Sequence, residues 1–584
     1  MMRPERSSSA VPLLGDSTFP ALAKVNTRRL ARPLLALVVL GVLSASAAYH
    51  SGVPAALEPY TDRLSSLKSW AASKPAPKFR ERVEWSEEDQ VLRNYTWETP
   101  EVHASLRRHV DALTPSRRRV YDWLYDTRVV SQGGTPIGLG ASDPPQEIRP
   151  GAAAPIHLSE PREGEGPGLF SSGSKNKYNE LVQEWKTGMP FTMCDKGTWE
   201  EDYAQLHAEM MTGEKEPWIL EYVCHEGGWC GGFADRMLGM ISTFLYSVVT
   251  GRAFALTWEQ PTPPDLVFDS PYIDWARPFN KTSSTPTPYP YSNRTIADNK
   301  LSLQGHDWPW FWLDDFFPKF NETYGAGKNE SWIQLDMNRG VVIRSFYYDN
   351  VQPVLEWMGL RATTAYNCLI NYLLRPKAAA LRFITQYTSL FSMPEYFTVG
   401  IQIRTGDWSM FATAQDQNTA QLHRKYFTCA SQIAARHAHP SQKVLYYLIT
   451  DSHKLEESAL KLYPNQVVVA GFTPTHDEIA FKDRSGPDVA KGSADGFMRT
   501  IAESWIFAGT DYQIITYRSG FGKIPTWLRG RDHTTVQMFN EYLDPALTAG
   551  VKAGNGGKLP PPPDCGKQSA FKSIEDLAQD WSLG

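Results

Sequence analysis

Polar side chains follow three apolar segments in the C-terminal half of the chain, and their types suit the binding of a phosphate. In the segment VGIQIRTGD, Arg404 and Asp407 come directly after alternating apolar residues. Residues 450–452 (TDS) and 516–519 (TYRS) follow two further apolar segments. The planar guanidinium group of arginine offers a fork of donors that matches phosphate oxygens. We therefore expect an anion site in which Arg404 contacts the phosphate. A strand-end arginine paired with Asp407 is the alternative.

Two glycine-containing turns add backbone donors to this picture. The turn RSGFGKI precedes a predicted helix at IPTWLRG, and free N–H groups at a helix start favour anions. In GGFADRM, Asp235 and Arg236 stand at the start of another predicted helix. A capping role for Asp235 is the alternative, because acids stabilise helix N-termini. No Cys-x-x-Cys, His cluster or Asp-x-Asp motif occurs, so we expect no metal and no cofactor.

Alternation of strands and helices must position these residues. The segments 218–224 and 253–258 read as strands on either side of a helix with apolar residues from Met237 to Val248. Strands at 396–404, 443–451 and 511–517 alternate with helices in the same way. Such βαβ units predict parallel sheets covered by helices. We expect two Rossmann-like lobes that face each other across a cleft, with ligands at the carboxyl ends of the strands.

The ends of the sequence suggest how the chain is organised. Basic residues precede an apolar segment at 33–49, which predicts a signal anchor with residues 1–32 in the cytoplasm and the body in the lumen. A cleaved signal peptide is the alternative, because Ala45-Ser46-Ala47 resembles a cleavage site. Residues 50–175 read as a partly helical, then Gly/Pro-rich stem, followed by lobes at 176–392 and 393–584. The net charge of −5 argues against a nucleic-acid-binding protein.

Sequons and cysteines fit a luminal body. Five Asn-x-Ser/Thr sequons lie beyond the predicted anchor, at Asn94, Asn280, Asn293, Asn321 and Asn329. The six cysteines allow three disulfides in an oxidising compartment, with fifteen connectivities. Cys224 and Cys230 are close enough in sequence to form one of them.

Several blocks of the chain, in order, resemble the plant-type GDP-fucose-dependent α-1,2-fucosyltransferases, including the xyloglucan enzymes. They are CGGFADRMLGMISTFLYSVVTGRAFALTW, PDLVFDSPYIDW, YNCLINYLLRP, GIQIRTGD, AESWIF, ITYRSGFGKIPTWLRG and PPPPDC, spread over roughly residues 215–570. The resemblance implies a metal-independent, inverting transferase of the GT-B fold, held in the Golgi membrane as a single-pass type II protein.

The resemblance also implies roles for single residues. Arg404 would contact the β-phosphate of GDP-fucose and stabilise the charge on departing GDP, with Asp235 and Arg236 facing it from the first lobe. Other residues would line the donor site, namely Asp451, Ser452, Thr516, Ser519, Phe521 and Gly522. On the acceptor side, Ser345 stands where the plant relatives carry an acid, and Asp349 follows four residues later. The identity of a general base therefore stays open.

These features lead to one expected function with two alternatives. We expect transfer of fucose from GDP-fucose to a glycan hydroxyl, such as O2 of a terminal galactose on a cell-wall polysaccharide or a glycoprotein. The first alternative is a related transferase that uses another GDP-sugar or a protein acceptor. The second is a non-catalytic glycan-binding or scaffold protein. The sequence leaves the oligomeric state open, including a homodimer.

Overall fold

The structure is a computed structural model of the 584-residue chain, in which ten longer stretches can be described. They are residues 104–131, 199–224, 231–258, 264–269, 272–275, 300–304, 331–406, 416–471, 499–542 and 561–579, with residues 317, 319–320, 322, 325, 409, 549, 552 and 558–559 between them. The chain divides into a unit Met1–Pro75, which holds no described residue, and a unit Ala76–Gly584, which holds every element below.

A parallel sheet forms the first half of the described fold, with the strand order β2-β1-β5-β4. Its strands are β1 (Ile219–Cys224), β2 (Ala253–Trp258), β4 (Lys300–Gln304) and β5 (Trp332–Asp336). Helix α8 (Phe233–Thr250) connects β1 to β2, and α7 (Trp199–Thr212) packs near β2. The predicted βαβ unit is therefore confirmed.

A buried carboxylate holds this first sheet together from the inside. Glu221, in the middle of β1, is fully buried. Its carboxylate accepts hydrogen bonds from Thr257 Oγ1 on β2 at 2.6 Å and from Trp332 Nε1 and Gln334 Nε2 on β5 at 2.7 and 2.8 Å. Because a buried charge is tolerated only when it is well paired, these donors lock the three strands in one register.

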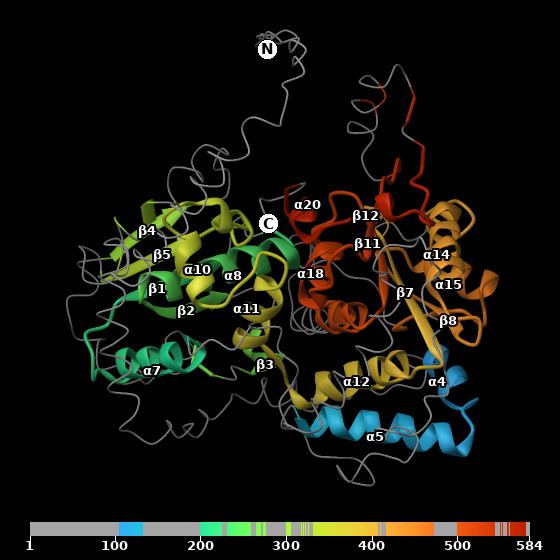
Figure 1. Ribbon diagram of the computed structural model, residues 1–584, viewed down its shortest axis with the longest axis horizontal. Coiled ribbons are helices and arrows are strands. Elements are labelled where there is room, and N and C mark those ends of the chain that lie inside the picture. The colour runs from blue at the N-terminus through green and yellow to red at the C-terminus, as the bar shows by residue number, and fades with distance from the viewer. Residues whose placement is uncertain are drawn as a thin grey trace, which may run out of the picture. The chain divides into compact units, whose positions relative to one another are not determined.

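A second, six-stranded sheet has the order β12-β11-β10-β7-β8-β9, and its strands β12, β11, β7 and β8 are labelled in Figure 1. Its strands are β7 (Tyr396–Ile403), β8 (Lys443–Thr450), β9 (Val467–Val468), β10 (Tyr512–Thr516), β11 (Thr535–Met538) and β12 (Phe571–Lys572). All pairs are parallel except β11 with β12. The helices of this half are α12 (Ala378–Ser392), α14 (Arg424–His437), α15 (His453–Leu462), residues 499–508, α18 (Gly520–Arg529) and α20 (Ile574–Gln579).

Shorter elements join the two sheets. They are η2 (Pro264–Leu266), β3 (Phe268–Asp269), η5 (Arg344–Tyr347), α10 (Gln352–Trp357), α11 (Ala365–Leu373), β6 (Arg375–Pro376) and η7 (Gln568–Ala570). β3 pairs with β6, which leads from α11 into α12. Across the junction, the Tyr366 ring of α11 stacks on the Trp527 ring of α18 with centroids 4.6 Å apart.

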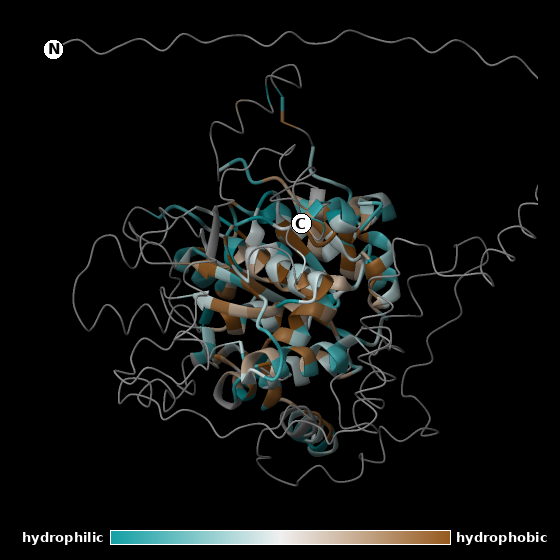
Figure 2. Cartoon of the chain, turned by 90° about the vertical axis from the view of Figure 1, so that its left-hand side faces the viewer, coloured by the Kyte–Doolittle hydropathy of each residue, from teal (hydrophilic) through white to brown (hydrophobic). Residues whose placement is uncertain are grey.

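Hydrophobic packing explains why these segments fold as they do. The strands β1, β2, β7 and β10 are buried along their whole length, as expected for parallel strands covered on both faces. Helices α14 and α15 bury only one set of residues, whereas α8 and α11 are buried almost all round. Figure 2 shows brown and teal residues mixed along the helices. Two α/β sheets are thus confirmed. The cleft between the lobes and the boundaries at 175/176 and 392/393 stay predictions.

The helical part of the predicted stem packs on the second sheet. It forms α4 (Ala104–Val110) and α5 (Pro115–Ser131). Helix α5 lies beside α12 (Figure 1), and α4 contacts β9. No helix among the described residues is long and apolar enough to cross a membrane. The predicted tail and anchor (1–32 and 33–49) lie outside the described residues.

Candidate functional site

The predicted phosphate site lies at the carboxyl edge of the second sheet. Strands β10, β7 and β8 are neighbours in that order and run parallel, so the residues that follow them meet at one edge. The sequence prediction that Arg404, the Asp451 region and the Thr516–Ser519 turn lie together is therefore confirmed.

Arg404 is the first residue after β7, and three contacts fix it. Its backbone N–H donates to Thr516 Oγ1 at 3.0 Å, and its carbonyl oxygen accepts from Asn540 Nδ2 at 2.7 Å. Its guanidinium nitrogen Nη1 forms an ion pair with the Asp451 carboxylate, and 23% of the Arg404 side chain stays exposed. The arginine is thus paired with Asp451, while Asp407 lies outside the described residues.

Asp451 is the centre of the hydrogen bonds at this edge. Oδ1 accepts from the backbone N–H and from the hydroxyl of Thr405, both at 2.7 Å. Oδ2 accepts from the backbone N–H of Gly406 at 2.9 Å and from Arg404 Nη1. The Asp451 side chain is 7% exposed. Its contacts with three consecutive residues make it a support for the loop that follows β7.

Ser452 takes part in a second set of contacts. Its hydroxyl oxygen accepts from the backbone N–H of Leu455 at 3.1 Å, which caps α15, and the hydroxyl donates to Asp416 Oδ2 at 2.5 Å. Asp416 Oδ1 in turn accepts from the backbone and side-chain nitrogens of Asn418 at 2.9 and 2.7 Å. Ser452 is fully buried, so in this structure its hydroxyl contacts protein groups.

Thr516 and Gln402 join β10 to β7 below the site. The Thr516 hydroxyl lies 3.0 Å from the Tyr426 hydroxyl, donates to the Gln402 carbonyl oxygen at 3.1 Å and accepts from Arg404 N–H. Gln402 Oε1 accepts from Thr516 N–H at 2.9 Å, and Gln402 Nε2 donates to Ser519 Oγ at 3.0 Å. Thr516 is fully buried, and its hydroxyl holds the backbone of Arg404 from inside the protein.

The N-terminus of α18 completes the edge next to Arg404. Ser519 is its N-cap residue and makes no side-chain cap hydrogen bond, and Phe521 in the first turn is half-buried. At Gly522 a Cβ atom would lie 2.7 Å from Gln402 Oε1 and 2.9 Å from Ile515 Cβ, so glycine lets the helix approach the sheet. The uncapped N–H groups and the helix dipole make this end attractive to anions.

The first sheet contributes a second helix N-terminus to the same region. The ring of Phe233, the first residue of α8, meets the ring of Phe521 edge to face, with centroids 6.4 Å apart. Asp235 Oδ2 accepts from the N–H of Gly232 at 3.2 Å, so the capping alternative for Asp235 is what the structure shows. Arg236 is buried, and its Nε donates to the Gly231 carbonyl oxygen at 2.8 Å. Roles of Asp235 and Arg236 in catalysis stay predictions.

The two predicted acceptor-side residues differ in exposure. Ser345 is fully buried, and its hydroxyl donates to the Val341 carbonyl oxygen at 2.7 Å and lies 3.1 Å from the Tyr246 hydroxyl. This burial leaves Ser345 without exposed surface for an acceptor. Asp349 is exposed. A contact of either residue with an acceptor stays a prediction.

One titratable group near the edge, His423, has a strongly shifted pKa. His423 is fully buried, and burial, with a smaller contribution from Lys425, lowers its pKa to about 4. Its Nε2 lies 2.9 Å from Asn418 Oδ1. The imidazole is therefore neutral at physiological pH. The described residues contain no group of three or more side chains that could hold a metal ion.

The modification sites are described only in part. All five predicted sequons (Asn94, Asn280, Asn293, Asn321 and Asn329) and Cys230 lie outside the described residues. A disulfide joins Cys429 to Cys565, and Cys224 and Cys368 are disulfide-bonded as well. The pairing of Cys224 with Cys230 stays a prediction.

Sequence reasoning missed the residues that support Arg404. They are Gln402, Asp416, Asn418 and Asn540; only Gln402 lies within a motif named above, and no role was predicted for it. A polar Gln402 between Ile401 and Ile403 in a strand buried on both faces was a usable signal, because a buried amide needs partners. Nothing in the local sequence around Asp416 or Asn540 marks them.

Comparisons with known proteins give distant similarities. No family model and no curated protein matches the chain. An arginine-to-lysine mutant of Arabidopsis thaliana FUT1 in complex with GDP is similar over 60% of this chain and 81% of its own, with 15% identity and a TM-score of 0.42. The fucosyltransferase NodZ from Bradyrhizobium is similar over 54% and 94%, with 15% identity and a TM-score of 0.32.

A structure of NodZ α-1,6-fucosyltransferase soaked with GDP-fucose gives similar values, with 56% and 97% coverage, 14% identity and a TM-score of 0.33. Similarities this distant carry no argument about the fold or activity of this chain.

Proposed function

We propose that this protein is a glycosyltransferase that moves fucose from GDP-fucose to a glycan hydroxyl with inversion. The observation that carries the proposal is the position of Arg404. Its side chain is partly exposed at the carboxyl edge of a parallel sheet, its backbone is held by Thr516 and Asn540, and the uncapped N-terminus of α18 follows the neighbouring strand β10 at the same edge. A guanidinium next to a helix N-terminus suits a pyrophosphate group.

The chemistry needs what this arrangement supplies. The acceptor oxygen forms a bond to C1 of fucose, the bond from C1 to the β-phosphate oxygen breaks, and its electron pair leaves with GDP. The acceptor proton passes to a base or to water. Arg404 and the N–H groups of α18 would stabilise the charge that develops on GDP, which is the electrostatic contribution that lowers such barriers most. Thr516, Ser519, Phe521 and Gly522 would shape this side of the site.

The identity of the sugar and of the acceptor rests on the sequence blocks. Their resemblance to the plant-type α-1,2-fucosyltransferases supports GDP-fucose as donor and O2 of a terminal galactose as acceptor, on a cell-wall polysaccharide or a glycoprotein. The predicted anchor supports a luminal body in the Golgi membrane.

Replacement of Arg404 by alanine tests the site. We expect Arg404→Ala to lower the transfer rate with GDP-fucose by about 100-fold or more, because it removes the cation at the leaving group. Arg531→Ala is the matched control, since Arg531 is also 23% exposed and paired with a carboxylate, Asp511, but stands beyond the C-terminus of α18. GDP release by the purified full-length chain gives the rate, and circular dichroism checks the fold. Equal activity in wild type and Arg404→Ala would show that Arg404 has no role in the mechanism.

Competition assays separate the proposal from its alternatives. We expect unlabelled GDP-fucose to compete with the labelled donor better than other GDP-sugars do, and galactose-terminated glycans to raise GDP release above hydrolysis. Preference for another GDP-sugar, or release only with protein acceptors, would favour a related transferase. Binding of glycans with no transfer from any GDP-sugar would favour a non-catalytic protein.

A further inference from the structure

The loop between β7 and α14 is held at two points by two consecutive residues that follow another strand. Asp451 and Ser452 follow β8 directly. Asp451 binds residues 404–406 at the start of the loop, and Ser452 binds Asp416 at its end. The sequence motifs do not predict this connection between distant segments of the chain. In the sequence, Asp451 and Ser452 are recognisable only as polar residues at the end of a strand.

The two ends of the loop are also joined to each other. The Thr405 and Ser409 hydroxyl oxygens lie 2.8 Å apart, and Asn418 Nδ2 donates to Ser409 Oγ at 3.0 Å. Asn418 is bound to Asp416, and Lys454 Nζ donates to the Asp416 carbonyl oxygen at 2.8 Å. We call these residues the loop neck: Thr405, Gly406, Ser409, Asp416, Asn418, Asp451 and Ser452.

The hydrogen-bonding capacity of Asp451 indicates what it does. Its two carboxylate oxygens accept four hydrogen bonds from the protein, two of them from backbone N–H groups, and its side chain is almost entirely buried. Little accepting capacity and little surface remain for a ligand. The partner that keeps some exposure is Arg404, whose planar group has five donors. In this ion pair, the arginine is therefore the side chain that is available to a ligand.

We propose that Asp451 is the positioning residue of the site, and that it acts by holding the Arg404–Gly406 segment through the loop neck rather than by contacting the nucleotide. This inference rests on the proposed function, because it takes the β-phosphate of GDP as the group that Arg404 contacts. Ser452 and Asp416 act on the other end of the same loop. The sequence predicted that Asp451 and Ser452 line the donor site. In the present proposal they instead support the loop that carries Arg404.

The experiment compares the binding of GDP and GMP with amide hydrogen exchange. GMP lacks the β-phosphate, so the ratio of the two affinities reports the contact with Arg404. In Asp451→Asn one acceptor oxygen becomes an NH₂ donor facing other donors. We expect faster exchange at the amides of Thr405 and Gly406, and a loss of GDP affinity of about tenfold or more. GMP affinity should change less than about threefold, so the ratio of GDP affinity to GMP affinity should fall. Arg404→Ala should lower this ratio in the same way.

A matched control exists at the opposite edge of the sheet. Asp511 precedes β10, its side chain is 10% exposed, and its Oδ2 accepts from the backbone N–H and the hydroxyl of Thr398 at 2.9 and 2.8 Å. Asp511→Asn should leave the GDP to GMP ratio and the exchange at Thr405 and Gly406 unchanged. If Asp451→Asn fails to fold, Asp416→Asn weakens the other end of the neck while Ser452 still caps α15, and it should lower the ratio in the same direction.

Two results would overturn the proposal. Unchanged exchange at Thr405 and Gly406 in Asp451→Asn would show that the carboxylate does not hold the loop. An equal loss of GDP and GMP affinity would show that Asp451 contacts the nucleoside directly. If the wild type binds neither nucleotide, the proposed function fails, and the exchange comparison still decides whether Asp451 holds the loop.

Discussion

At the scale of single residues, the site depends on polar groups that are buried and fully engaged. Thr516 offers one hydroxyl to the Arg404 N–H, the Gln402 carbonyl and Tyr426, and Asp451 accepts from three consecutive residues. Loss of one partner in such a network leaves a buried group unsatisfied, which costs about 1–3 kcal/mol. Arg404 is therefore held from several directions at once, as a group that must meet a developing charge should be.

A buried carboxyl group on α15 gives the second lobe an unusual dependence on pH. Burial, opposed by Arg499 and reinforced by Glu503, raises the pKa of Glu456 from 4.5 to about 8. Between pH 4.5 and 8 the folded state therefore binds more protons than the unfolded state. The stabilising contribution is complete below about pH 4.5 and is lost as pH rises towards 8.

Replacement of Glu456 by glutamine tests this prediction. We expect the free energy of unfolding of Glu456→Gln, compared with that of wild type, to be higher at pH 8 than at pH 5. The reason is that the amide keeps the shape of the neutral acid and cannot ionise. Glu457→Gln is the control, since Glu457 is the next residue of α15 and its side chain is 59% exposed. Urea denaturation at both pH values measures the difference. Parallel pH profiles for wild type and Glu456→Gln would contradict it.

At the scale of elements, α4 and α5 belong to the packing of the second sheet. Ser105 on α4 is buried, and its hydroxyl donates to the Val469 carbonyl oxygen at 2.8 Å and accepts from the Val469 N–H at 3.0 Å. Tyr121 on α5 donates to the Gln386 carbonyl oxygen of α12 at 3.1 Å. These contacts cover the β9 side of the sheet, where exposed strand groups would otherwise invite association.

Removal of the Ser105 hydroxyl tests the contribution of α4. We expect Ser105→Ala to lower the free energy of unfolding by about 1–3 kcal/mol, because it leaves the backbone N–H of Val469 without its hydroxyl acceptor and leaves the carbonyl oxygen only the 3.5 Å contact with the Tyr387 hydroxyl. Ser116→Ala at the start of α5 should change stability by less than about 0.5 kcal/mol, since the contact of Ser116 with Thr114 is exposed. Urea denaturation compares the two variants. Equal stability would show that α4 is not part of the folded second lobe.

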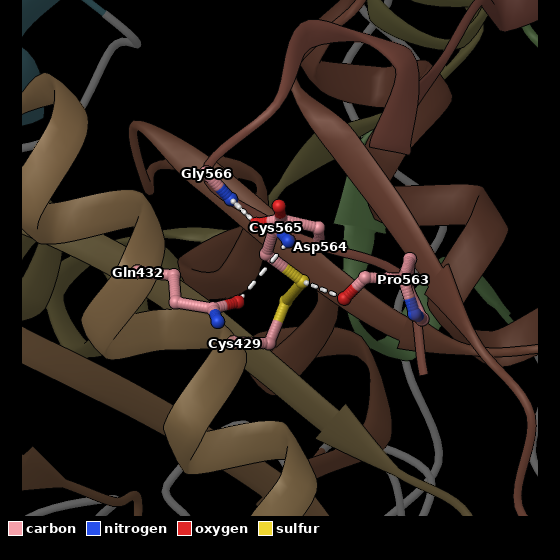
Figure 3. Close-up of a disulfide and its surroundings, with 6 residues drawn as sticks. All are labelled: Cys429, Gln432, Pro563, Asp564, Cys565 and Gly566. Carbon is pink, nitrogen blue, oxygen red and sulfur yellow. Dashed lines mark hydrogen bonds between the residues drawn. A yellow bond between two sulfur atoms is a disulfide. The ribbon is translucent and has the colours of Figure 1, made fainter. Parts of the chain in front are cut away.

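At the scale of the described fold, the C-terminal segment ties the two sheets together. Cys565 is bonded to Cys429 on α14, and its N–H donates to Gln432 Oε1 at 3.1 Å (Figure 3). Farther along, the carbonyl oxygen of Leu577 on α20 accepts from Lys523 on α18 at 2.7 Å. Glu575 accepts from the Tyr347 hydroxyl of η5 at 2.6 Å, a bond that raises the pKa of Tyr347 to about 12.

Loss of this disulfide should lower stability substantially. Cys429 and Cys565 are separated by 136 residues, and a cross-link over a loop of that size stabilises by about 3–5 kcal/mol through the entropy of the unfolded chain. We expect Cys565→Ser with Cys429→Ser to lower the melting temperature clearly, while the Arg404 edge keeps its nucleotide affinity at low temperature. Thermal unfolding and GDP titration measure the two effects. An unchanged melting temperature would contradict this account.

The sequence by itself determined most of the elements around the site and the edge at which the site lies. Apolar runs and helical spacing placed β1, α8, β2, β7, α14, β8 and α15 close to their observed bounds, because these patterns depend on local burial. The alternation of strands with helices also predicted parallel sheets, and parallel neighbours bring Arg404, Asp451 and Thr516 to one edge. Asp235 could be read as a capping residue because a cap needs only three residues of sequence.

Only the tertiary structure decided which side chains pair at that edge. Arg404 stands three residues before Asp407, but it binds Asp451, 47 residues away. Asn540 from another segment supports Arg404, and Ser452 holds Asp416 farther along the loop. Helices α4 and α5 pack on the second sheet instead of remaining a separate stem. The physical reason is that strand order and helix docking set these distances, and neither is encoded in local spacing.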